Sequence, residues 1–223
     1  MGIFKKIWKS LNKEFTPEKA RTIQNVAIFG FADAEPESRL FKDTFKVCKA
    51  LAEAGYTIVD GGGPGVMLAA SKGAKAGNGK VIGVTLYPSD TSNFEGRSPD
   101  NIVDEEIKTT TYVERTLTLM QQGQVYVIFN GGTGTISELG MAWGLARMYF
   151  GHHKPLILYG NFWKKIMKVL GDNLMLRPEE KEVYKIVDSP REVLKAIKDF
   201  EFEIESDRIK DLKISGEKGY SFT

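Results

Sequence analysis

The stretch of sequence that decides the fold runs from Val125 to Glu138 and reads VYVIFNGGTGTISE. Its first five residues are apolar, which predicts a short strand that is covered on both faces. The glycine-rich turn that follows opens a helix, which we expect to extend from Thr135 to about Met148. A buried strand that passes through a tight turn into a helix is the repeating unit of α/β proteins.

The same alternation of strand and helix continues in both directions from this stretch. Short apolar runs predict further strands, and apolar residues at helical spacing predict the helices between them. The strands are expected at 26–29, 56–59, 81–86, 156–159 and 184–187, and the helices at 36–54, 66–76, 112–122, 162–170 and 190–200, with a polar loop at 88–104. The expected fold class is therefore α/β, a Rossmann-like, doubly wound parallel sheet.

The order of the strands determines where a ligand would bind. If the six strands follow the common order 3-2-1-4-5-6, the first and fourth strands are neighbours at the point where the winding reverses. Ligands of such sheets bind there, beyond the carboxyl ends of the strands. Two loops are therefore of interest, the one after Gly30 and the one after Phe129.

The composition is that of one ordinary globular domain. The chain has 223 residues, of which 42% are hydrophobic and 27% are charged, and these fractions argue against disordered, collagen-like and disulfide-scaffold proteins. We expect one domain at 25–200, an amphipathic helical appendage at 1–24 and a polar C-terminal tail at 201–223 that frays. The formal net charge of +2 is too balanced for a general nucleic-acid binder, so no nucleic-acid partner is expected.

Cysteine usage and hydropathy bear on the cellular compartment. Cys48 is the single cysteine, so it makes no intramolecular disulfide, and its apolar surroundings favour a core thiol over a nucleophile. We expect a reducing, cytoplasmic location. No apolar run approaches the length of a membrane span. Residues 1–11, MGIFKKIWKSL, present an apolar helical face opposite lysines, which either contacts a membrane surface or docks on the protein's own domain; we favour docking.

Two glycine motifs are the candidate ligand-binding segments. In the second motif, residues 130–138, glycines let backbone N–H groups converge at the start of a helix, which is a natural seat for a phosphate. The first motif, residues 60–67, is either a ligand-binding loop or a turn with close backbone packing. The expected nucleotide contacts are Gly131, Gly132, Thr133, Gly134 and Thr135 from the second motif, Gly61, Gly62, Gly63, Gly65 and Met67 from the first, and Gly30.

Several other binding chemistries are disfavoured. The dinucleotide fingerprint GxGxxG does not follow the first strand, and no P-loop with its Gly-Lys-Ser/Thr ending occurs, which argues against dehydrogenases and nucleoside triphosphatases. His152 and His153 are adjacent and point in different directions, so a two-histidine metal site is not expected. We expect no metal and no cofactor.

The two glycine motifs resemble those of the LOG family, the cytokinin-activating phosphoribohydrolases. GGGPGVM at 61–67, continuing as LAASKGA to residue 74, and NGGTGTISE at 130–138 are similar to the family patterns GGGxxGxM and PGGxGTxxE, in the same order. The resemblance extends from about Asn25 to Phe200. It implies a catalytic pair of Arg115 and Glu138, because Arg115 lies 23 residues ahead of Glu138, the family spacing.

A few positions depart from the family pattern. Asn130 stands in place of its proline, Thr116 in place of the usual lysine, and Leu119 where methionine is common. After the first strand, Phe31 and Ala32 stand where the family tends to have small hydroxyl residues.

These observations support two hypotheses about function. The first is an enzyme that hydrolyses the N-glycosidic bond of a nucleoside 5′-monophosphate such as AMP, releasing the free base, for example a cytokinin or adenine, and ribose 5-phosphate. Glu138 would stabilise the ribosyl cation and activate water, and Arg115 would hold the phosphate or ribose or orient Glu138. The second is a non-hydrolytic binding protein for a nucleotide or the molybdenum cofactor. Without the family, Glu138 also fits an ordinary first-turn glutamate and Arg115 a surface salt bridge with Glu114.

A homodimer is expected from the helix that carries Glu138. Met141, Trp143, Leu145 and 148–150 make this helix apolar around much of its circumference. One face would pack on the sheet and another would need a partner, as the family resemblance also implies. The alternative is a helix buried under the N-terminal segment.

Overall fold

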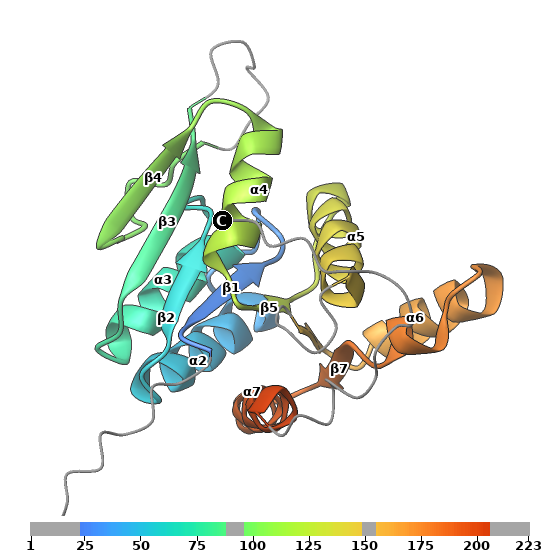
Figure 1. Ribbon diagram of the computed structural model, residues 1–223. Helices are drawn as coiled ribbons and strands as arrows, with labels where there is room; N and C mark the ends of the chain where they lie inside the picture. Colours follow the sequence, from blue (N-terminus) through green and yellow to red (C-terminus); the bar gives the residue numbers. More distant parts are fainter. Residues whose placement is uncertain (1–22, 88–95, 149–154, 206–223) are drawn as a thin grey trace, which may run out of the picture.

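The computed structural model describes residues 23–87, 96–148 and 155–205, and shows a sheet flanked by helices (Figure 1). The strands are β1 (Asn25–Phe29), β2 (Thr57–Asp60), β3 (Val81–Leu86), β4 (Glu105–Thr109), β5 (Val125–Ile128), β6 (Leu156–Tyr159) and β7 (Tyr184–Val187). The helices are α2 (Arg39–Glu53), α3 (Val66–Ala76), α4 (Tyr112–Gln122), α5 (Thr133–Met148), α6 (Trp163–Asn173), the 3-10 turn η1 (Pro178–Lys181) and α7 (Pro190–Glu205).

The sheet is parallel throughout, with the order β4-β3-β2-β1-β5-β6-β7. This confirms the doubly wound α/β fold and the expected order of the six predicted strands. The winding reverses between β1 and β5, which are neighbours, with Phe29 in register with Ile128. The loops after these two strands therefore emerge side by side at one edge of the sheet.

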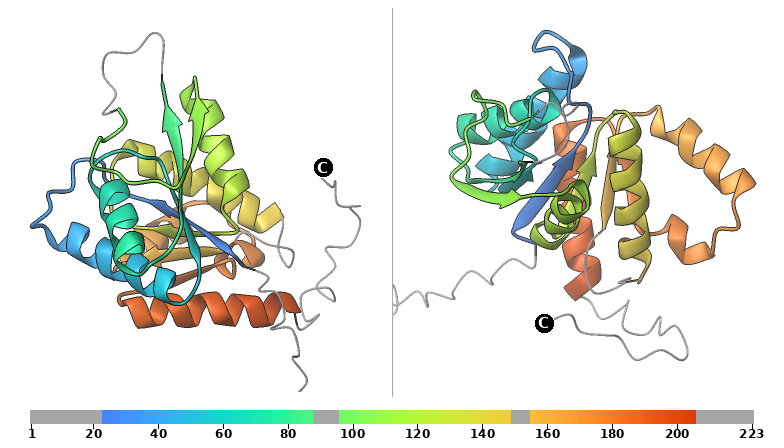
Figure 2. Two further views of the ribbon diagram at one scale, coloured as in Figure 1. Left: turned by 90° about the vertical axis from the view of Figure 1, so that its left-hand side faces the viewer. Right: turned by 90° about the horizontal axis from the view of Figure 1, so that it is seen from above.

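Two hydrophobic cores lie on opposite faces of the sheet. On one face, Val26 and Ile28 of β1 belong to a core completed by α2, α3 and α7; on the other, Ala27 and Phe29 belong to a core completed by α4, α5 and α6. Figure 2 shows α7 lying beside α2 on its side of the sheet. Because side chains alternate between faces, strands buried on both sides must be apolar at consecutive positions.

Cys48 confirms the expectation of a core thiol. It lies on α2 with no exposed surface, inside the first of the two cores. Burial is the main cause that raises the pKa of this thiol well above its usual range, so the reactive thiolate is disfavoured.

Strand β4 was not expected from the sequence. Its residues, EEIKT, pair with β3 at the outer edge of the sheet, and only Thr109 among them is buried. An edge strand with one solvated side needs no continuous apolar run, so a search for apolar runs overlooks it.

Some helix ends differ from the sequence prediction. Helix α2 begins at Arg39 because the side chain of Ser38 caps it by accepting a hydrogen bond from the N–H of Phe41. Helix α5 begins at Thr133, two residues earlier than expected, and α7 continues to Glu205, so residues 201–205 of the assigned tail are helical.

Several expectations concern residues outside those described. The amphipathic segment 1–11, the adjacent histidines His152 and His153 and most of the C-terminal tail belong to this group. Within the described residues, none of the helices combines the length and apolar character needed to cross a membrane.

Candidate functional site

A cavity of about 250 Å³ lies at the carboxyl ends of β1 and β5, where the winding of the sheet reverses. This is the position at which open α/β sheets bind their ligands. The cavity is lined by Ile28, Phe29, Gly30, Phe31, Ala32, Gly61, Met67, Tyr112, Arg115, Leu119, Gly132, Thr133, Gly134, Thr135 and Glu138.

The structure brings most of the predicted site residues to this cavity. Both members of the predicted catalytic pair line it, together with Gly30, Gly61, Met67, Gly132, Thr133, Gly134 and Thr135. Gly62, Gly63, Gly65 and Gly131 do not line it. The first glycine motif is thus partly a cavity wall and partly a packed turn.

The second motif forms the beginning of α5. Because the helix begins at Thr133, the threonines and Gly134 lie in its first turn, where backbone N–H groups have no partner within the helix. Thr133 and Gly134 are exposed, and Thr135 is buried. The hydroxyls of Tyr112 and Ser137 lie 2.5 Å apart and join the start of α4 to this turn. The arrangement combines converging N–H donors, hydroxyl groups and the positive end of a helix dipole, which suits an anion.

Arg115 reaches from α4 into the first motif. Its Nε donates to the carbonyl of Val84 at 3.1 Å, and its Nη2 donates to the carbonyl of Gly61 at 3.2 Å. The same Nη2 lies 3.2 Å from Sδ of Met67. The side chain is buried, with the residue only 5% exposed, which excludes the alternative of a surface salt bridge. Two backbone carbonyls therefore fix a cationic group at the cavity wall.

Glu138 lies in the second turn of α5. The residue is 8% exposed and lines the cavity, so it is not the first-turn surface glutamate that the sequence left as an alternative. A carboxylate held inside a cavity next to an anion-binding helix end is well placed to act on the part of a ligand that follows its phosphate.

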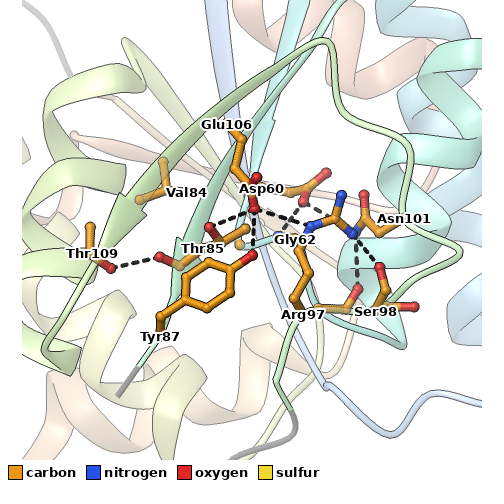
Figure 3. Close-up of polar contacts among 12 residues, drawn as sticks. Asp60, Gly62, Val84, Thr85, Tyr87, Arg97, Ser98, Asn101, Glu106 and Thr109 are labelled. Atoms are coloured by element: carbon orange, nitrogen blue, oxygen red, sulfur yellow. Dashed lines mark hydrogen bonds and ion pairs between the residues drawn. The ribbon is translucent and has the colours of Figure 1, made fainter. Parts of the chain in front are cut away.

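Asp60 and Asn101 hold the backbone of the first motif in place through hydrogen bonds. Neither residue was identified from the sequence as part of the site. Oδ1 of Asp60 accepts a hydrogen bond from the N–H of Gly62 at 2.7 Å (Figure 3). Nδ2 of Asn101 donates to the carbonyl of Gly63 at 3.0 Å. The N–H of Ser98 donates to the carbonyl of Gly62 at 3.0 Å. An aspartate directly after a buried strand was the signal available in the sequence.

Burial raises the pKa of Asp60 to about 7. The residue has no exposed surface, and its Oδ2 has no hydrogen-bond partner among the described residues. The hydrogen bonds from Gly62 and Asn101, and the charges of Arg115 and Arg97, oppose this increase without cancelling it.

Next to these residues, the carboxylate of Glu106 accepts hydrogen bonds from three side chains, including Arg97. Its Oε1 accepts from Thr85 Oγ1 at 2.9 Å, from Tyr87 Oη at 3.0 Å and from Arg97 Nε at 3.3 Å. Burial is the largest single effect on the pKa of Glu106 and raises it, but the hydrogen bonds from Thr85 and Tyr87 and the charge of Arg97 together lower this pKa below its ordinary value. These contacts hold the segment that carries Asn101 against β3.

The departures from the family pattern are not equivalent. Thr116 is buried and does not line the cavity, and its hydroxyl donates to the carbonyl of Tyr112 at 2.9 Å. Asn130 does not line the cavity, whereas Phe31, Ala32 and Leu119 do. Of the departures that line the cavity, Phe31 is the one that is aromatic.

Comparisons with known proteins agree with this architecture. The model of the SLOG cluster4 family matches residues 23–181. A Mycobacterium tuberculosis protein named cytokinin riboside 5′-monophosphate phosphoribohydrolase is 30% identical over 172 residues, which are 74% of this chain and 89% of that protein.

Two solved structures share the fold. The molybdenum cofactor binding protein of Rippkaea orientalis matches with a TM-score of 0.60 and 24% identity, over 80% of this chain and 97% of that one. DNA processing protein A of Helicobacter pylori, described by its single-stranded DNA binding mode, matches with a TM-score of 0.54 and 15% identity, over 79% and 81%. At these identities the likeness shows the fold alone.

Proposed function

Since the chain belongs to the SLOG cluster4 family and is a LOG-like protein, we propose that it is a nucleoside 5′-monophosphate phosphoribohydrolase. The observation that carries the proposal is that Arg115 of α4 and Glu138 of α5 line one cavity with the first turn of α5. A cation, a carboxylate and an anion-binding helix end are the three groups that such a reaction needs.

The 5′-phosphate would bind at Gly132 to Thr135, the part of the predicted phosphate loop at 131–135 that lines the cavity. Its oxygens accept hydrogen bonds, and the first turn of α5 offers backbone N–H groups, threonine hydroxyls and a favourable dipole. The ribose would then lie next to Glu138, which is one turn further along the same helix. The base would extend toward Gly30, Phe31 and the Gly61 end of the first motif.

The reaction would break the bond between C1′ of the ribose and the nitrogen of the base. The bonding electrons leave with the base, and C1′ passes through an oxocarbenium-like state that a nearby carboxylate stabilises. Water adds to C1′ after giving a proton to Glu138, and a proton returns to the base nitrogen. The products are the free base and ribose 5-phosphate. Arg115 would hold the ribose or phosphate side of the substrate.

Release of free base from AMP and from isopentenyladenosine monophosphate tests the proposal. Glu138→Gln keeps the size of the side chain and removes its charge, so turnover should fall by about 100-fold or more while binding changes little. Arg115→Ala should reduce both turnover and affinity, because a cation that faces the ligand contributes to ground-state binding too. Wild-type base release that Glu138→Gln leaves unchanged would contradict the catalytic assignment.

The second candidate is a binding protein for a nucleotide or for the molybdenum cofactor that does not hydrolyse its ligand. Its specific support is the engagement of Arg115 by the carbonyls of Gly61 and Val84, which is compatible with a structural role for this side chain. Wild-type protein that binds AMP in calorimetry and releases no base would favour this candidate. We also propose that the protein is cytoplasmic and that it forms a homodimer through the surface of α4 and α5.

A further inference from the structure

Phe31 is a large apolar residue at the cavity that the catalytic proposal does not use. It follows β1 directly, lines the cavity and is 42% exposed. Single exposed apolar residues are common on protein surfaces, so the exposure alone carries no meaning. A function of Phe31 is indicated by the position in which its backbone is fixed.

The backbone of Phe31 is fixed to both glycine motifs. Its N–H donates to the carbonyl of Asn130 at 3.0 Å, directly before the glycines of the second motif. Its carbonyl accepts from the N–H of Val66 at 3.0 Å, the first residue of α3 after the glycines of the first motif. The ring of Phe31 therefore starts from a fixed point between the two loops that form the site.

Two glycines that do not line the cavity make this attachment possible. A Cβ on Gly65, whose φ is +60°, would lie 2.2 Å from the carbonyl oxygen of Ala32 and 2.5 Å from that of Phe31. A Cβ on Gly131 would lie 2.1 Å from Oγ1 of Thr135 and 3.1 Å from the nitrogen of Phe31. Both glycines allow the backbone of Phe31 to approach closely, which gives them a role that ligand contact does not explain.

The cavity wall is divided chemically. Thr133, Thr135 and Glu138 supply hydroxyls and a carboxylate at the start of α5, whereas the guanidinium of Arg115 lies beside Gly61 and Met67. The hydroxyl of Tyr112 lies at that same end, beside Ser137. The remaining described side chains of the lining are apolar, and they are Ile28, Phe29, Phe31, Ala32, Met67 and Leu119. A ligand with an anionic end and a flat apolar end fits this division.

Resting on the proposed function, we propose that Phe31 is the stacking platform for the heterocyclic base of the nucleoside monophosphate. Bases stack on aromatic side chains whatever their hydrogen-bonding edge, because every base has a π-face. No described side chain on the apolar part of the lining offers a hydrogen bond to a base edge. The site then selects by ring area, so purine nucleoside monophosphates bind more tightly than pyrimidine ones.

The experiment measures the affinities of AMP, CMP and ribose 5-phosphate by calorimetry. The proteins are the wild type, Phe31→Ala, Phe31→Trp and the control Phe202→Ala, which truncates a phenylalanine of α7 that is 65% exposed and outside the cavity. Loss of one base–aromatic stack should weaken AMP binding about 5- to 150-fold in Phe31→Ala. Ribose 5-phosphate should bind as before, Phe31→Trp should keep AMP affinity, and the control should match the wild type.

Each outcome separates this inference from the function it rests on. Equal loss of AMP and ribose 5-phosphate affinity in Phe31→Ala, unchanged AMP affinity, or CMP binding as tight as AMP would overturn the stacking role while leaving the phosphate site in place. A wild-type protein that binds none of the three ligands would overturn the proposed function and the stacking role together.

Discussion

At the scale of single residues, the site depends on close contacts that only glycine permits. A Cβ placed on Gly61 would lie 1.7 Å from Nη2 of Arg115 and 2.7 Å from Sδ of Met67. The guanidinium is in turn held by two backbone carbonyls and cannot remain in place if this space is filled. Gly61 therefore leaves the space that the guanidinium of Arg115 occupies, in addition to lining the cavity.

Gly61→Ala should therefore displace the guanidinium and reduce base release to the level of Arg115→Ala. Gly171→Ala on α6 is a matched control, because a Cβ there would approach only Lys181, at 3.9 Å. Base release and thermal melting of both variants check this. If Gly61→Ala keeps wild-type turnover, the position of Arg115 does not matter for the reaction.

Asp60 should make stability depend on pH in an unusual direction. Burial raises its pKa to about 7 from an ordinary 3.8, so the folded protein holds a proton that the unfolded chain has lost. The contribution of this group to the free energy of unfolding is therefore complete below pH 4 and is lost as the pH rises to 7. Asparagine does not titrate, so Asp60→Asn does not lose stability in this way. The free energy of unfolding of Asp60→Asn minus that of the wild type should therefore increase by on the order of 2 kcal/mol from pH 5 to pH 8.

Urea denaturation at the two pH values measures this, with Asp104→Asn as the control. The hydrogen bond from Lys75 is the main cause that lowers the pKa of Asp104, so its contribution is present above the ordinary value and is constant over this range. A stability difference between Asp60→Asn and wild type that is the same at pH 5 and pH 8 would show that Asp60 does not titrate there.

At the scale of elements, the first turn of α5 should distinguish a nucleotide from its nucleoside. AMP at 100 times its dissociation constant should stabilise the protein by about 2.7 kcal/mol, a melting shift of about 5–10 °C. Adenosine at the same concentration lacks the phosphate and should shift the melting temperature much less. Equal protection by AMP and adenosine would mean that residues 131–135 are not the phosphate site.

The strands that are buried on both faces of the sheet could be predicted from the sequence, whereas a strand with an exposed face could not. Helices at 66–76 and 112–122 have the predicted bounds, and the predicted strands lie in the predicted order. Strand β4 was missed because its outer position leaves it polar. In the site, most of the predicted motif residues line the cavity. The sequence alone does not distinguish a glycine that lines the cavity from one, such as Gly65, whose missing side chain lets a neighbouring stretch of backbone pack closely against it.

At the scale of the whole molecule, the expected dimer face needs revision. Met141, Trp143 and Leu145 are partly buried against the protein's own core, and Nε1 of Trp143 donates to the carbonyl of Glu180 at 2.7 Å. The large hydrophobic side chains left exposed on α4 and α5 are Tyr112, Val113, Leu117, Ile136 and Met148, which are 43% to 62% exposed. We propose that a second copy docks on α4 and α5 and covers some of these side chains.

Light scattering should then give about twice the 24.9 kDa mass of one chain at micromolar concentration. Val113→Glu combined with Leu117→Glu should yield a monomer, because burying two carboxylates in an apolar interface is costly. Val169→Glu, which changes a residue of α6 that is 60% exposed, should remain dimeric. A monomeric wild type would reject the dimer.

The charged outer strand β4 limits how the protein assembles with itself. A strand at the border of a sheet can recruit a strand from another molecule through its free backbone groups, and charged side chains discourage this. Glu105, Glu106 and Lys108 are exposed on β4. Growth of the sheet from one molecule into the next is thereby disfavoured at this border.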